Sequence, residues 1–359
     1  MVDTTKQQYF LGANSPDGFH SLYQQMVPPK DATAIYILKG GAGCGKSTLM
    51  RQLSAEAMAR GIPVDEILCS GDPDSLDGVI FPTLKIAVAD GTAPHVIEPQ
   101  FAGVVERYVN LGECYDSQKL QEVRGELVDC MTHYSECCAL TIPCLAAAGE
   151  LGSTISSVLV TPKLEERLAK RASGILSREV KAKGGQSVGS VTQRFLSGNT
   201  CKGRLSLLHT ATNQCEKVYV LWDSYGIASH LLLPLLTGAV NRGYHVIACL
   251  NPMFPKQLEH LIIPELGLCF LSSTPSLPVE GEHFRKIRME TLLDSGLLHQ
   301  NRSRLRIYRK MYHSLLEEVV ATLAENKLIH DRMEEIYHPY VNFDLLSEFA
   351  KKLGEEIFP

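Results

Sequence analysis

Positive charge is not in excess in this chain, because 35 Lys and Arg residues face 40 Asp and Glu residues and the net charge is −5. A nucleic-acid-binding domain usually carries a basic face, so nucleic acid is not indicated as the main partner. Paired Cys-x-x-Cys units and zinc-type Cys/His spacings are missing among the 11 cysteines. The first eight residues are polar, so we expect no secretory signal and a cytoplasmic protein with reduced thiols.

Long uninterrupted hydrophobic runs are also missing. The most apolar stretch, residues 139–160, is interrupted by Pro143, Gly149 and Glu150. A membrane-spanning helix needs about 20 predominantly apolar residues, so we expect no membrane partner. The 359 residues exceed what one hydrophobic core usually holds, which predicts two domains.

A glycine-rich loop is the most informative motif that the chain does contain. Residues 34–38 predict a buried strand, and Leu49, Leu53 and Ala57 recur at helical spacing after the loop. Between them, the pattern G-x-x-x-x-G-K-[ST] is met at residues 40–47. We predict that the loop binds a nucleoside triphosphate, ATP or GTP, through Gly40, Gly41, Ala42, Gly43, Cys44, Gly45, Lys46, Ser47 and Thr48.

The chemistry of each loop position follows from its residue type. Glycines let the backbone curl so that its N–H groups point at phosphate oxygens, and the positive end of the next helix adds to the field. Lys46 would contact the β- and γ-phosphates, and Ser47 would place its hydroxyl on Mg²⁺. Base recognition lies outside the loop, and no NKxD guanine signature is evident near a strand end.

The chain contains an internal repeat. Phe10-Leu11 and the following Asn14 match Phe195-Leu196 and Asn199 at a separation of 185 residues. The strand at 35–38 matches 218–221 at 183 residues, and 80–84 matches 262–266 at 182. A separation that drifts this little predicts a duplicated domain with small loop deletions.

The second copy has lost the loop chemistry. Asp223 stands where the first copy has Gly40, and the lysine is replaced. An acid at this position would repel phosphate, so the second half is predicted to be a degenerate P-loop-like unit. His230, at the position of the magnesium serine, is either a ligand or an ordinary histidine at a helix start.

Acidic residues near the loop are the remaining site candidates. The strand ending at Asp90 predicts a second holder of Mg²⁺, although Asp90-Gly91 also fits an ordinary turn. Asp72, Asp74 or Asp77 could orient the attacking water or a substrate hydroxyl, or could simply form a turn. His95, in the loop after Asp90, could contact the γ-phosphate. The predicted catalytic set is therefore Lys46, Asp90, Asp77 and His95.

Each half ends in a helical segment. The first half is predicted at 1–184 with helices over 116–182, and the second at 191–359 with helices over 302–357. We expect each segment to pack as an antiparallel hairpin, and a protein partner could bind there. The joint is the Gly/Ser-rich stretch 181–192.

The loop at 39–48, the segment 90–95 and the repeated Phe-Leu…Asn element resemble a little-characterised family of bacterial tandem P-loop proteins, described as ATPases. The resemblance implies a P-loop NTPase-type α/β fold built on a parallel sheet, internally duplicated, with ATP as ligand; residues 223–230 depart from it. We therefore predict an ATP-binding and ATP-hydrolysing protein with one Mg²⁺ site. The alternatives are a small-molecule or nucleotide kinase, and a non-catalytic nucleotide switch or scaffold for a protein partner. Arg204 and Arg242 are candidates for a group supplied from the second half.

Overall fold

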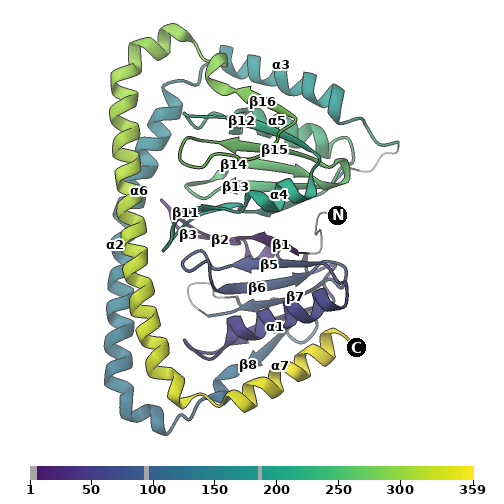
Figure 1. Cartoon of the computed structure of the whole chain (residues 1–359). Coiled ribbons are helices and arrows are strands. Elements are labelled where there is room, and N and C mark those ends of the chain that lie inside the picture. Colours follow the sequence, from purple (N-terminus) through teal and green to yellow (C-terminus); the bar gives the residue numbers. More distant parts are fainter. Residues whose placement is uncertain (1–5, 93–96, 185–187) are drawn as a thin grey trace.

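The computed structural model describes residues 6–92, 97–184 and 188–359, and it is a mixed α/β structure with two six-stranded sheets (Figure 1). In the first sheet the order is β1-β5-β6-β7-β4-β8, and β6 alone runs antiparallel to its neighbours. Its strands are β1 (Lys6–Tyr9), β4 (Ala34–Lys39), β5 (Val64–Leu68), β6 (Leu76–Phe81), β7 (Ile86–Asp90) and β8 (Glu106–Asn110).

The second sheet has the order β9-β13-β14-β15-β12-β16, with β14 antiparallel to its neighbours. Its strands are β9 (Val191–Arg194), β12 (Lys217–Trp222), β13 (Val246–Asn251), β14 (Phe254–Ile263), β15 (Leu268–Ser273) and β16 (Arg285–Arg288). Taken in chain order, corresponding strands occupy corresponding places in the two sheets. The register also agrees, because Leu38 pairs with Asp90 as Leu221 pairs with Ser272.

Two short hairpins join the halves. They are β2 (Gly12–Ser15) with β3 (Gly18–Ser21), and β10 (Ser197–Thr200) with β11 (Gly203–Ser206). Between the sheets, Phe10 and Phe195 exchange two backbone N–H···O=C bonds of 3.0 Å, and both rings are fully buried. The two residues that the repeat matches therefore face each other across the joint, and the core continues from one half into the other.

One face of each sheet carries a helix from its own half. α1 (Lys46–Ala59) packs on β6, and α5 (Ser229–Val240) packs on β14. A shorter helix, α4 (Leu208–Gln214), lies near β1 and β15. The 3₁₀ turns are η1 (Tyr23–Gln25), η2 (Leu111–Cys114), η3 (Lys119–Val123), η4 (Pro264–Leu266), η5 (Met289–Leu292) and η6 (His338–Tyr340).

The remaining helices cross between the halves, which corrects the expected hairpins. α2 (Arg124–Ser157) packs along α6 (Ser295–Tyr337) of the other half, as two long antiparallel helices beside both sheets (Figure 1). α3 (Pro162–Glu179) then covers α5 of the second half, and α7 (Phe343–Ile357) covers α1 of the first half. α3 begins at a Thr-Pro pair: the Thr161 hydroxyl caps the helix by accepting a bond from Leu164 N–H at 3.2 Å, and Pro162 occupies the first helical position.

α2 contains most of the apolar stretch 139–160, which we expected not to span a membrane. Together, η3 and α2 (Lys119–Ser157) are nevertheless long and apolar enough to do so by length and composition, with 28% of the most apolar window buried. Leu140 and Ile142 are more than half exposed, whereas Leu145 and Ala148 are buried near α6. The expectation of no membrane partner therefore stays a prediction.

Candidate phosphate-binding site

The glycine loop lies between β4 and α1, so the expected order of strand, loop and helix is present. Gly43 and Gly45 have φ angles of +67° and +81°, in the left-handed region that residues with a Cβ rarely adopt. Gly45 is also the N-cap of α1, so the loop passes directly into the first turn of the helix. Two of the glycines are therefore required by the path of the backbone.

Most backbone N–H groups of this loop have no partner in the described part of the chain. Among the hydrogen bonds of residues 6–92, 97–184 and 188–359, none is donated by a backbone N–H from 42 to 48, while the N–H of Gly41 lies beside the Tyr115 hydroxyl. Buried or half-buried backbone donors are nearly always paired, so a run of free N–H groups is unusual. These residues are half-buried apart from the buried Cys44 and the exposed Thr48. The loop thus keeps its hydrogen-bonding capacity for an anion.

Lys46 folds back over the start of the loop. Its Nζ donates to the carbonyl oxygens of Gly40 at 2.9 Å and Gly41 at 2.8 Å, and lies 3.6 Å from Asp90 Oδ2. The side chains of Lys46 and Asp90 are only 12% and 13% exposed. β7 lies beside β4 in the sheet, which is why an acid at its carboxyl end reaches the lysine. The structure therefore brings Lys46 and Asp90 together, as the sequence suggested.

Ser47 and Asp90 are the two candidates for holding Mg²⁺. The Ser47 hydroxyl oxygen accepts a bond from Leu76 N–H at 2.9 Å, and Asp90 Oδ1 accepts bonds from the amide and hydroxyl of Thr92 at 2.8 and 2.6 Å. A hydroxyl oxygen has a second lone pair, and among the described residues Asp90 Oδ2 has only its ion pair with Lys46. Mg²⁺ usually takes one or two protein oxygens and fills its other positions with waters and phosphates, so this donor set fits the ion.

The other acidic candidates have partners of their own. Asp77 lies inside β6 rather than in a loop, is 4% exposed and accepts a bond from Tyr23 Oη at 2.8 Å. Asp77 is therefore neither part of a turn nor placed to orient a substrate, and both expectations for it are wrong. Asp72 lies 3.4 Å from Lys327 of α6, and Asp74 pairs with Lys202. His95 lies outside the described residues.

Residues of the C-terminal helices lie against the loop, and no pattern in the sequence predicts them. A Cβ at Gly45 would lie 2.3 Å from Leu346 of α7, and one at Gly43 would lie 3.2 Å from the backbone of Glu334 in α6. Tyr115 donates from its hydroxyl to the carbonyl of Ala42 at 2.9 Å and stacks obliquely on Tyr337. Burial raises the pKa of Tyr115, so its hydroxyl keeps the proton that it donates.

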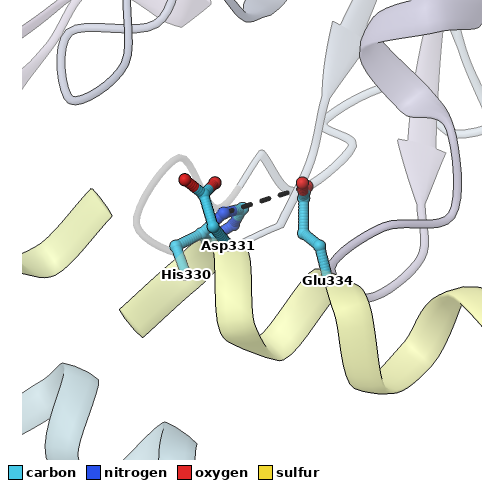
Figure 2. A group of neighbouring side chains, drawn as sticks. All are labelled: His330, Asp331 and Glu334. Carbon is cyan, nitrogen blue, oxygen red and sulfur yellow. Dashed lines mark ion pairs between the residues drawn. The ribbon is translucent and has the colours of Figure 1, made fainter. Parts of the chain in front are cut away.

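Three side chains on the same part of α6 form a titratable cluster, His330, Asp331 and Glu334, whose ligand atoms lie within 4.8 Å of one another. Figure 2 shows them on one stretch of the helix, with His330 Nδ1 3.8 Å from a carboxylate oxygen of Glu334. Asp331 also pairs with the ammonium of Lys327. That cation competes with any metal ion for the Asp331 carboxylate, so the cluster is read as an ordinary ion-paired helix face beside the loop.

The corresponding loop of the second half is filled by its own side chain. The Asp223 carboxylate is 4% exposed and accepts bonds from the backbone N–H groups of Tyr225 at 3.1 Å, Gly226 at 3.0 Å and Ala228 at 2.7 Å. Burial raises the pKa of Asp223, against the opposing effect of these donors. The acid predicted to repel phosphate thus occupies the amides that would bind it.

The three remaining second-half candidates have local contacts. His230 lies at the start of α5, with Nδ1 3.6 Å from a carboxylate oxygen of Glu165 in α3. Arg204 faces Glu259 of its own half at 3.4 Å. Arg242 follows α5, and its carbonyl accepts a bond from Lys183. In the described part of the chain, neither arginine forms a hydrogen bond or an ion pair with the first loop.

Comparison of the chain with protein-family models, with curated proteins and with solved structures finds no significant match. The resemblance to tandem P-loop ATPases therefore stays a prediction.

Proposed function

We propose that the chain is an internally duplicated P-loop NTPase-type protein whose first half binds ATP with Mg²⁺ and hydrolyses it. The main support is the contrast between the two loops. Among the described residues, no backbone N–H from 42 to 48 has a partner in the first half, whereas the carboxylate of Asp223 accepts bonds from the corresponding loop of the second. Consecutive free N–H groups at a helix N-terminus favour a phosphate chain.

In this proposal the loop amides and Lys46 bind the β- and γ-phosphates. Lys46 would exchange its bonds to the carbonyls of Gly40 and Gly41 for phosphate oxygens, and its charge would stabilise the transferring group. Ser47 and Asp90 would hold Mg²⁺, which when bound neutralises phosphate charge. Duplication is supported by the matching strand orders and by the reciprocal bonds between Phe10 and Phe195. GTP remains possible, because nothing in the loop reads the base.

The test is equilibrium binding of ATP and GTP with Mg²⁺, together with phosphate release. Lys46→Ala should weaken binding by about tenfold or more, since it removes a charged contact to phosphate. Ser229→Ala, at the corresponding position of the second loop, is the matched control and should leave ATP affinity unchanged. At 100-fold excess over Kd, ATP should stabilise the wild-type protein by about 2.7 kcal/mol. Absence of binding by the wild type at about 1 mM nucleotide would refute the proposal.

A nucleotide-dependent switch is a second candidate, favoured by the packing around the loop. The loop is contacted by Glu334 and Tyr337 of α6 and by Leu346 of α7. A change in the backbone of the loop would therefore change how these helices pack against it. Hydrogen exchange over 327–357 with and without ATP tests this. A protection change confined to 40–60 would exclude the switch and leave ATP binding intact. The kinase alternative has less support, because Asp72, Asp74 and Asp77 each have partners.

A further inference from the structure

A cavity of about 130 Å³ lies in the second half, beside the loop that carries Asp223. Its walls include Arg204 from β11, Glu259 from β14, Ser272 from β15 and Tyr312 from α6. Two buried atoms of these walls, Arg204 Nε and Ser272 Oγ, have no hydrogen-bond partner among the described residues. Buried polar atoms are nearly always paired, so these two indicate that a polar ligand belongs in the cavity.

The mouth of the cavity continues into a basic groove of about 430 Å³ along α6. Arg309 and His313 line both the cavity and the groove, and Arg302 and Arg306 line the groove alone. Residues 295–316 contain no Asp or Glu. In the described part of the chain, none of these arginines forms an ion pair. The groove therefore has unbalanced positive charge.

The two carboxylates of the cavity have partners of their own and do not neutralise the arginines of the groove. Asp223 accepts three backbone N–H bonds, and Glu259 contacts Arg204, Ser197 and His260. Burial, followed by the charges of Arg309 and Arg204, lowers the pKa of His313. Cations are thus crowded at the junction of cavity and groove, and an anion bound there would relieve their repulsion.

We propose that the second half binds a small organic phosphate, with its phosphate against Arg306 and Arg309 and its hydroxyl-bearing body in the cavity, where it pairs with Arg204 Nε and Ser272 Oγ. Guanidinium groups bind phosphate through two parallel N–H···O bonds, and the groove offers several. A small molecule is favoured over nucleic acid because the two unpaired atoms are buried in the walls of a cavity of only about 130 Å³, which has no room for a polymer strand. This binding mode differs from that of the first loop, because the backbone N–H groups of the second loop already donate to Asp223.

The experiment is calorimetry on the full chain carrying Lys46→Ala, with EDTA present, so that the first loop and metal effects are suppressed. The probes are pyrophosphate and ribose 5-phosphate. Both should bind, and Arg306→Ala with Arg309→Ala should weaken both by about tenfold or more. Arg304→Ala removes one positive charge from the same helix outside the groove and should change affinity less than about twofold, whereas Arg306→Ala or Arg309→Ala alone should weaken binding more than this. Ser272→Ala should weaken ribose 5-phosphate alone.

Three results would overturn the inference. The first is absence of binding at about 5 mM of either probe. The second is a loss of probe affinity in Arg304→Ala equal to that in the groove variants. The third is a single-stranded oligonucleotide that binds more tightly than either probe and depends on Arg304 as much as on the groove arginines. Arg306→Lys with Arg309→Lys keeps the positive charge but removes the paired N–H donors of the guanidinium, so it should still weaken binding. This variant provides a second test in case the alanine variant does not fold. The outcome is separate from the ATP proposal, because all arms carry Lys46→Ala.

Discussion

Replacing Asp223 tests whether a carboxylate really stands in for phosphate in the second loop. Asp223→Ala removes an acceptor of three backbone N–H bonds, and the group is 4% exposed. Hydrogen bonds to a charged group contribute about 1.5–3 kcal/mol each, but water from the adjoining cavity can replace some of them and the buried charge itself is costly. We therefore expect a loss of about 3 kcal/mol in the free energy of unfolding.

Asp223→Asn is the graded comparison. Its amide oxygen can still accept from Tyr225 and Gly226, but its NH₂ group cannot accept from Ala228, so a loss of about 1–2 kcal/mol is expected. Urea unfolding at pH 7, followed by circular dichroism and by the fluorescence of Trp222, the single tryptophan, measures both variants. The reasoning fails if Asp223→Ala unfolds within about 0.5 kcal/mol of the wild type.

Two further perturbations address the loop of the first half and the cavity of the second. Gly45→Ala should lower the free energy of unfolding, followed by thermal unfolding, by about 1–2 kcal/mol, because φ is +81° and the new Cβ would meet Leu346. Adding Leu346→Ala should recover part of this loss. Full stability of Gly45→Ala would contradict the prediction. Burial raises the pKa of Glu259, but His260, Arg204 and Ser197 together hold it below its ordinary value. Its contribution is therefore present above about pH 4.3 and lost as pH falls through the folded pKa. Glu259→Gln should lower stability at neutral pH and converge with the wild type in acid; a constant difference across pH would contradict this.

Local patterns in the sequence predicted the centre of the first half well. The strand at 34–39, the loop and the helix from Lys46 follow from β-branched residues, glycines and helical spacing, each of which acts within a few residues. The neighbouring position of Asp90 followed from the expectation that its strand is parallel to the loop strand. Asp77 was misplaced because β6 is antiparallel, and its buried pairing with Tyr23 depends on a residue 54 positions away.

The helices were predicted as elements but not in their packing. Spacing of apolar residues shows that a helix has a face to bury, but it does not say which face of the protein will cover it. Thr161 and Pro162 mark the start of α3, yet nothing in that segment specifies α5 as its neighbour. The filling of the second loop was likewise hidden, because an Asp at a loop start predicts repulsion of phosphate as readily as substitution for it.

The exchanged helices place both proposed sites along one element. α6 carries Arg306 and Arg309 at the second-half groove and Glu334 against the first loop, and it is one uninterrupted helix of 43 residues. At about 1.5 Å per residue, the two contacts are separated by about 40 Å of continuous helix. We therefore infer that a ligand which moves this helix at one end can change its packing at the other. Any such coupling is reciprocal, because binding free energies are linked. The degenerate half would then serve as the place where a second ligand adjusts the nucleotide site of the first.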